Sequence, residues 1–350
     1  MEFKFTLINN WSTIFSEEFR DKWTEYFQAS KNKNIFMHPA LNIAWLNTYI
    51  KIYKIEPFFI LAEKDSRKVF FPLVLWKRNW KNLFKKLLVP VGNSDFDYNE
   101  PYLLNDFSAD EIDLFFNDLL LFLKLEKIYY DSVEISGLRE TFFNSVIFKS
   151  NEFSCPIIRL EENSTFEEYL QYLPKKLKKD IRRRTNKLQQ IGDLDFVRIY
   201  DAKEALIFLP NFLEMYRKRR PNAFIPEGFH ENLINECCKN NLIEFSMLML
   251  NNKPISIRIA FILDNTYYSY LPVLDTNYSK YSIGNIHRLD TLRNAYDEDY
   301  IIYDMLRGNK KYKEKWAFEE VMMNSFYSLS NKLSSKGKNF FFKVKFRILR

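Results

Sequence analysis

The chain has 350 residues, 47% hydrophobic and 17% aromatic, so it can build a full core and is not a disordered protein. Its length suffices for two domains. There are 52 basic and 45 acidic residues, a net charge of +7 that favours anionic partners without choosing among them. The cysteines Cys155, Cys237 and Cys238 lack metal-ligand spacing, which disfavours a metal site or a disulfide framework and favours a reducing compartment.

Membrane insertion is not predicted, because no apolar run approaches the ~18–20 residues of a membrane span. The first residues also lack the apolar core of a signal peptide. We expect a cytoplasmic protein, with peripheral contact to the inner face of the membrane as a bolder alternative. Trp76 to Pro90 fits either an interfacial helix or, more simply, a hairpin arm with a returning strand. The alternating tail at residues 340–350 fits an edge strand or a membrane contact.

The first part of the chain is typical of a mixed α/β domain. An alternating strand at residues 3–7 precedes two helical patterns. Two apolar runs separated by a polar turn at Lys64 to Arg67 then predict a β-hairpin. The helices are expected at Ser12 to Phe27, Pro39 to Tyr53 and Asp110 to Leu125, and the hairpin strands at Phe58 to Ala62 and Val69 to Leu75.

A domain boundary is expected near Cys155-Pro156. After it, Ser164 and Glu167 fit a capping box that begins a helix. A very basic helix follows from Lys175 to Lys187, with Gly192 as its left-handed stop. Its narrow apolar stripe consists of Leu177, Ile181, Leu188 and Ile191.

The next helix should begin at Asp201 with Glu204, and Pro210 should break or kink it. Three antiparallel strands then alternate with two short polar turns that favour positive φ. A helix and a further strand complete the pattern. The strands are expected at Ile243 to Leu250, Lys253 to Leu263, Thr266 to Val273 and Tyr300 to Asp304, with the turns at Asn251-Asn252 and Asp264-Asn265 and the helix from Gly284 to Asn294.

The start of this last helix is a candidate anion site. A helix N-terminus presents unpaired N–H groups and a partial positive charge, Gly284 would let the backbone approach a pyrophosphate, and Lys280 and Arg288 could add charge. A single glycine is a weak phosphate signal, so a turn followed by an ordinary helix cap is the simpler interpretation.

Asp304 ends a predicted strand, where α/β sheets tend to place ligands. The turn at Arg307-Gly308 would leave Tyr312 and Lys313 facing the same cleft. An aspartate can act as a base, a tyrosine can deliver a proton and a lysine can bind a phosphate or carboxylate. The spacing fits equally well an Asx turn with a solvated basic segment after it.

The basic helix and the histidines carry weaker signals. The helix could grip the phosphates of a nucleic acid or nucleotide-linked substrate, although a solvated outer face is the commoner explanation. His38, His230 and His287 have no metal-ligand spacing. We expect His230 and His287 to be capping or surface residues.

Three motifs in order resemble the GNAT-superfamily acyltransferase domain of CelD-type proteins, which are similar to proteins of cellulose and exopolysaccharide biosynthesis. The first is the basic helix that leads to Gly192, and the second is YLPVLDTNYSKYSIG. The third, from Asp304 to Trp316, matches the family pattern Asp-x-x-x-Gly-x-x-x-Tyr-Lys-x-x-Trp. Gly92, Asp95 and Tyr98 resemble a motif of the family's leading half-domain.

The resemblance implies a mixed-sheet α/β fold with two GNAT-like halves, the N-terminal one degenerate. It places these halves at residues 1–155 and 156–325, with a basic-aromatic tail at 326–350. It also implies transfer of an acyl group, expected to be acetyl, from acyl-CoA to an amine or hydroxyl. The acceptor would be a small molecule or lipid-linked glycan, such as an amino sugar of cell-surface polysaccharide biosynthesis.

Site roles follow from the same resemblance. Asp304 is the expected base or acceptor-orienting group, and Tyr312, with Tyr278 as substitute, the proton donor to the departing thiolate. Cofactor contacts are expected at Tyr270, Leu271, Val273, Ser282, Gly284, Asn285 and Arg288, and acceptor contacts at Arg307, Gly308, Lys313 and Trp316.

Two other function classes stay open. A FemAB-like aminoacyl-tRNA-dependent peptidyltransferase also pairs two GNAT-like halves and would use the basic helix on tRNA. A non-catalytic, membrane-associated polysaccharide-assembly protein would bind lipid and no acyl-CoA.

Overall fold

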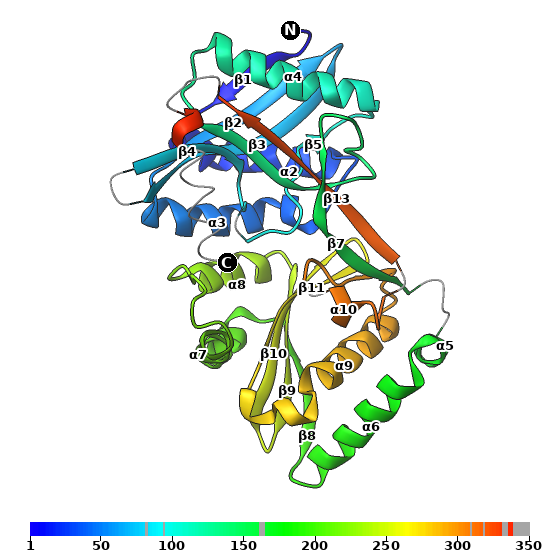
Figure 1. Ribbon diagram of the computed structural model, residues 1–350. Coiled ribbons are helices and arrows are strands. Elements are labelled where there is room, and N and C mark those ends of the chain that lie inside the picture. The colour runs from blue at the N-terminus through cyan, green and yellow to red at the C-terminus, as the bar shows by residue number, and fades with distance from the viewer. Residues whose placement is uncertain are drawn as a thin grey trace. The chain divides into compact units, whose positions relative to one another are not determined.

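The computed structural model describes residues 1–80, 83–93, 95–160, 165–308, 310–317, 319–330 and 335–338. The chain forms two compact units (Figure 1). The first contains residues 1–152 and returns at 322–350, and the second contains residues 153–321. The fold is mixed α/β, as predicted from the sequence.

The first unit is a sheet with helices on both faces. Its strands follow the order β1-β2-β3-β4-β6-β13, and β5 pairs with β3. One face packs against α4 through phenylalanines such as Phe116, and the other carries Trp23 and Trp45 from α2 and α3. The elements are β1 (Lys4–Ile8), α1 (Trp11–Ile14), α2 (Glu17–Ala29), α3 (Pro39–Ile52), β2 (Ile55–Lys64), β3 (Arg67–Trp80), β4 (Leu83–Pro90), β5 (Tyr102–Leu103), α4 (Ala109–Leu125), β6 (Ser132–Arg139) and β13 (Glu319–Leu329), with a 3₁₀ turn η1 (Ile35–Met37).

The second unit has the same construction around strands in the order β7-β12-β11-β10-β9-β8. Helices α5, α6 and α9 cover one face, and α7 and α8 lie on the other (Figure 1). The elements are β7 (Lys149–Arg159), α5 (Phe166–Tyr172), α6 (Lys175–Gln189), β8 (Leu194–Ile199), α7 (Ala202–Arg219), α8 (Phe229–Cys238), β9 (Ile243–Leu250), β10 (Lys253–Leu263), β11 (Thr266–Leu274), η2 (Thr276–Tyr281), α9 (Ile283–Asp297), β12 (Ile302–Asp304) and α10 (Lys310–Lys313).

The two units share a topology that the sequence does not reveal as a repeat. In the first, the antiparallel strands β2, β3 and β4 lead through α4 to β6, which pairs parallel with β4. In the second, the antiparallel strands β9, β10 and β11 lead through α9 to β12, which pairs parallel with β11. The chain therefore repeats one α/β plan, and this supports the prediction of two similar halves.

Turn chemistry explains why the central strands of the second unit were predicted closely. The pairs Asn251-Asn252 and Asp264-Asn265 all adopt positive φ, between 44° and 61°. Asparagine and aspartate tolerate this conformation better than most residues, and two such residues make the turn that matches the twist of a hairpin. The register of the three strands follows from these turns.

Several local predictions are wrong. Pro210 does not break α7, which continues to Arg219 with buried Leu209 and Phe212 on its inner side. The capping box of α5 uses Thr165 and Glu168, one residue later than predicted, and Ser164 lies outside the described residues. Ile191 is 50% exposed and does not extend the buried stripe of α6.

Gly192 does not act as a left-handed helix stop, since it is absent from the positive-φ residues of the described chain. Its missing side chain instead makes room for Asn251, whose amide would lie 2.3 Å from a Cβ at this position. The Asn251 Oδ1 accepts a hydrogen bond from the backbone N–H of Asp193. The glycine thus serves a close contact between the α6–β8 connection and the β9–β10 turn.

The interfacial-helix alternative for Trp76 to Pro90 is also wrong. This stretch forms the end of β3 and all of β4, and the side chains of Trp76, Leu87 and Leu88 are buried within the first unit. Among the described residues, no helix has the length and apolar character to cross a bilayer. The tail at 340–350, for which an edge strand was predicted, lies outside the described residues.

Candidate functional site

The C-terminal half of β11 has an open backbone edge. Its parallel partner β12 ends at Asp304, opposite Tyr268. Among the described residues, no strand covers this side of β11 from Ser269 to Leu274. Leu271 and Val273 pair with Ile259 and Ile257 of β10, and the bond from the Asp275 N–H to the Ile255 carbonyl continues this register, so their backbone groups face β10. The alternate residues Pro272 and Leu274 face the open side, and only Leu274 of these two has an N–H.

A β-bulge accompanies this open edge. Ile259 and Phe261 of β10 pair with Leu271 and Tyr268 of β11, so β11 carries one extra residue in this interval. A bulge bends the strand and redirects its backbone groups, and bulges are common beside active sites. The bulge includes Tyr270, for which a cofactor contact was expected.

The chain after β11 turns sharply into α9. Asp275 caps the 3₁₀ turn η2 by accepting from the N–H of Asn277 at 2.9 Å. Ser282, the residue before α9, has φ 50°, a left-handed conformation that is uncommon for a residue other than glycine. The first turn of α9 then contains Gly284, where an added Cβ would lie 3.2 Å from the Leu274 side chain. The missing side chain lets α9 begin directly against the end of β11.

A basic hollow lies next to the start of α9. It is open, encloses about 830 Å³ including its mouth, and has Lys280 and Tyr281 of η2 on one side. On the other side are residues of the second half of α6, among them Lys187. An Arg184 Nη1 donates to the carbonyl of Lys280 and ties the two sides together. The lining residues are Arg183, Arg184, Lys187, Gln190, Ile191, Lys280 and Tyr281.

The loop after β12 is held by buried polar contacts. The Asp304 Oδ1 accepts from the N–H of Leu306 at 2.7 Å, which is an Asx turn. The Lys313 Nζ donates to the carbonyls of Met305, Leu306 and Arg307 at 2.5, 2.6 and 2.9 Å. Asp304 and Lys313 are only 4% and 7% exposed, so both act within the loop in this structure.

The three hydrogen bonds from the Lys313 Nζ hold the backbone conformation of this loop. Leu306 has φ 54°, which costs free energy for a residue with a side chain. A Cβ at Gly308 would lie 2.9 Å from the Lys313 Nζ, so a larger residue here would displace the ammonium group from its present position. The scarce glycine of the third motif is therefore explained by a lysine five residues later.

Helix α10 contacts α9 through Tyr312. Its hydroxyl donates to the Asn285 Oδ1 at 2.6 Å, and its ring lies over the guanidinium of Arg288 with 5.0 Å between Cζ and the ring centroid. The fully buried ring of Trp316 lies on the same guanidinium at 5.8 Å. The beginning of α9 and the segment after β12 thus meet in one place.

The structure brings most residues of the second and third motifs to one end of the second unit. Asn285, Arg288, Tyr312 and Trp316 contact one another, while Lys280 lies apart from them in the basic hollow. Tyr278 packs half-buried against the core of the unit, and Arg307 is exposed. No single sequence motif predicts this separation of Lys280 from Arg288.

The prediction that His230 and His287 are capping or surface residues is wrong, because both are buried. Burial lowers the pKa of His230 to about 4. His287 lies between two serines, 3.1 Å from Ser246 Oγ and 2.6 Å from Ser256 Oγ. Burial and, to a smaller extent, the charges of Arg258 and Arg288 hold its pKa well below the usual range.

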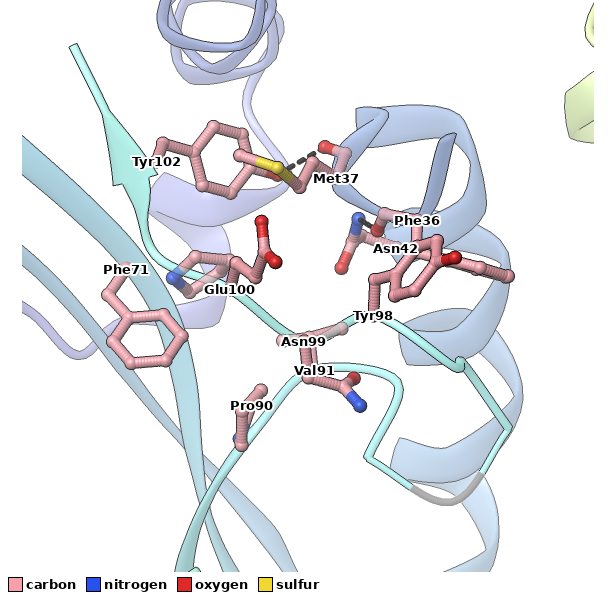
Figure 2. A pocket seen from close by; sticks show the side chains of 11 residues that line it. Phe36, Met37, Asn42, Phe71, Pro90, Val91, Tyr98, Asn99, Glu100 and Tyr102 are labelled. Carbon is pink, nitrogen blue, oxygen red and sulfur yellow. Dashed lines mark hydrogen bonds between the residues drawn. The ribbon is translucent and has the colours of Figure 1, made fainter. Parts of the chain in front are cut away.

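A small hollow in the first unit is not a substrate site. It lies among Phe36, Asn42, Asn99 and Glu100 (Figure 2) and has room for about one water molecule. Glu100 is occupied by its ion pair with Arg139 at 2.7 Å. The buried Asn99 Oδ1 has no hydrogen-bond partner among the described residues, and a single water would satisfy it.

Residues 175–314 match a family model described as an acetyltransferase (GNAT) domain. This segment contains α6, the basic hollow, the open edge of β11, α9 and α10. A comparison with curated proteins found no match.

Solved structures resemble the chain over most of its length. A conserved protein of unknown function from Bacteroides thetaiotaomicron has TM-score 0.54 and 14% identity, covering 93% of this chain and 100% of its own. FemX has TM-score 0.58 and 9% identity, with 89% and 96% covered. The C-terminal domain (DUF2156) assigned to a lysylphosphatidylglycerol synthetase from Agrobacterium fabrum has TM-score 0.52 and 7% identity, with 91% and 94% covered.

At such low identity these structures establish the fold alone. The family model adds the class of the domain. Residues 175–314 are therefore similar to acetyltransferase domains of the GNAT type.

Proposed function

We propose that this domain transfers an acyl group, of which acetyl is the first candidate, from acyl-CoA to an amine or hydroxyl. The observation that carries the proposal is the position of the basic hollow beside the start of α9, inside the matched segment. Cationic side chains next to a helix N-terminus favour phosphate groups. In the proposal Lys187 and Lys280 hold the phosphates of the donor.

The open edge of β11 is the proposed place of the thioester. A backbone N–H group on this edge, between Tyr270 and Leu274, would polarise its carbonyl and stabilise the negative charge that develops there. The acceptor nitrogen or oxygen attacks the carbonyl carbon, the carbon–sulfur bond breaks and the thiolate takes a proton. Tyr312 is the proposed proton donor, with Tyr278 as substitute, and Asp304 orients or deprotonates the acceptor.

The acceptor is proposed to be a small molecule or lipid-linked glycan with an amino-sugar unit, as in CelD-like proteins of polysaccharide biosynthesis. Such a role is compatible with a cytoplasmic enzyme that contacts the membrane peripherally. Arg307, exposed beside the site, is the proposed contact to an anionic acceptor.

A FemAB-like peptidyltransferase is the second candidate, favoured by the resemblance to the fold of FemX and by the basic face of α6. Binding to charged tRNA would weaken steeply with salt, because cations released from phosphates dominate such binding. Acyl-CoA binding, in contrast, should persist at moderate salt.

The proposal is tested by thermal shift and by release of free thiol. Acetyl-CoA should raise the melting temperature of the parent, since a ligand bound only by the native state stabilises it. The double variant Lys187→Gln/Lys280→Gln should lose most of this shift, whereas Lys239→Gln, an exposed lysine on the far end of α8, should keep it. The proposal is wrong if no acyl-CoA shifts the parent and no acceptor in an amine and amino-sugar panel releases thiol.

A further inference from the structure

Arg288 is a buried cation with incomplete hydrogen bonding. Arg288 is only 4% exposed. Its Nε and Nη1 atoms are buried and have no hydrogen-bond partner among the described residues. No carboxylate of the described chain forms an ion pair with it. Its identified neighbours are the rings of Tyr312 and Trp316, which attract a cation but cannot accept the in-plane N–H groups.

Such an arrangement is costly for a folded protein. An arginine cannot lose its charge in a protein, and a buried charge is normally paired. With methionine or leucine at this position the folded protein should be at least as stable, because replacing a buried charge with an apolar residue of similar size is often neutral or stabilising. An unpaired guanidinium therefore points to a partner that arrives from outside the chain.

The hydrogen-bond partners identified next to Arg288 among the described residues are neutral. On β10, the fully buried Arg258 donates only to the neutral hydroxyls of Ser269 and Tyr303. The Tyr303 hydroxyl is 2.9 Å from the Thr291 Oγ1, which in turn donates to the carbonyl of Arg288. The chain of hydroxyl groups that begins at Arg258 thus ends at the main-chain carbonyl of Arg288 and leaves its guanidinium without these partners. A second donor, the Trp316 Nε1, is buried without a partner in the described chain.

We propose that Arg288 is the counter-charge of a binding site for an oxygen-bearing anionic group, a phosphate or carboxylate, and that Tyr312 covers this site in the free protein. The half-buried ring of Tyr312 lies on the guanidinium, and its hydroxyl holds Asn285 one turn earlier on α9. A phosphate or carboxylate forms strong charge-assisted hydrogen bonds with a guanidinium, and the unpartnered Nε and Nη1 atoms of Arg288 are donors for such bonds.

The anionic group has two sources, the acyl-CoA donor and the acceptor. The inference deepens the proposed function, but anion binding at Arg288 does not require acyl transfer, so an inactive protein could still confirm it. Arg293, also on α9, is a matched control: it is exposed, and it too lies over an aromatic ring, with 5.1 Å from its Cζ to the centroid of Phe166.

The test compares Arg288→Met, Arg288→Lys and Arg293→Met by thermal denaturation at constant ionic strength, with chloride replaced stepwise by inorganic phosphate or by acetate. We expect the free Arg288→Met protein to melt at or above the parent temperature and to lose the rise that phosphate or acetate gives the parent. Arg288→Lys should keep part of that rise, and Arg293→Met should keep all of it.

Acetyl-CoA distinguishes the two sources. A loss of at least tenfold in acetyl-CoA affinity in Arg288→Met assigns the site to the donor, whereas unchanged acetyl-CoA affinity with a lost phosphate or acetate response assigns it to the acceptor. The inference is overturned if the parent shows no anion-specific rise, or if Arg288→Met melts below the parent and keeps the same anion response. Either result would make Arg288 a structural residue.

Discussion

The Tyr312 hydroxyl donates a 2.6 Å hydrogen bond to the Asn285 side chain and so joins the short helix α10 to the first turn of α9. These residues are 27 positions apart, and the strand β12 lies between them in the chain. The bond fixes the position of Tyr312, the candidate proton donor, relative to the proposed acyl-CoA site.

Tyr312→Phe separates the chemical role of this hydroxyl from its structural one. The variant keeps the ring over Arg288 and loses one hydrogen bond, so stability should fall by about 1 kcal/mol. The turnover number at saturating donor should fall at least tenfold, because general acid catalysis is worth about 10²–10⁴-fold. Asn285→Ala breaks the same bond but keeps the hydroxyl, and its turnover should fall much less. Equal turnover in the two variants would remove Tyr312 from the chemistry.

Asp304 can be tested with two substitutions. In Asp304→Asn the side-chain oxygen still accepts from the N–H of Leu306, so the fold should be nearly as stable as the parent. Asp304→Ala loses this buried bond and should cost about 1–2 kcal/mol in chemical denaturation. If the carboxylate serves the reaction, both variants should lose acyl transfer. A fully active Asp304→Asn variant would show that acyl transfer does not need the Asp304 carboxylate.

Lys313 should be a major determinant of loop stability. Lys313→Met removes the donor that satisfies three buried carbonyls and leaves Leu306 in an unfavourable backbone conformation. We expect a loss of about 3 kcal/mol in the free energy of unfolding, measured with urea. The exposed neighbour provides the control, and Lys311→Met should change stability by less than about 0.5 kcal/mol. Similar stabilities for the two variants would contradict the claim that the hydrogen bonds of Lys313 stabilise the loop.

His230 predicts a specific pH dependence. Burial lowers its pKa in the folded protein to about 4, against 6.5 for an ordinary histidine. Between these values the unfolded chain binds a proton that the folded protein does not, so stability falls as pH decreases from 6.5 to 4 and is fully present above 6.5. The difference amounts to about 3 kcal/mol. His230→Phe keeps a ring against Phe212 and should reduce the slope of this part of the pH profile, leaving the share of His287, whose pKa burial also lowers; an unchanged slope would show that other groups cause it.

The strand positions of the second unit could be predicted because local chemistry decides them. The turns at Asn251-Asn252 and Asp264-Asn265 need residues that tolerate positive φ, and the sequence supplies them next to apolar strands. For β7 and β13, in contrast, neither alternation of apolar residues nor flanking turn residues predict a strand. Their positions depend on pairing with segments far away in the sequence, such as β12 and β6.

The sequence proposes candidate site residues, and their assignment stays a prediction, but it does not indicate how they are arranged. A lysine after a turn is usually solvated, and nothing local indicates that Lys313 turns inward onto three carbonyls. The local sequence also does not predict the positive φ angles of Ser282 and Leu306, because tertiary contacts impose these conformations. Buried Arg288 and His287 have the ordinary spacing of helical residues, and only the packed structure shows what surrounds them.

A crystal structure of the protein with acetyl-CoA tests the central claim most directly. We expect the phosphates to contact Lys187 or Lys280 in the basic hollow before α9, and the thioester carbonyl to lie against the open edge of β11 between Tyr270 and Leu274. Acetyl-CoA bound elsewhere, with this edge of β11 empty, would contradict the account.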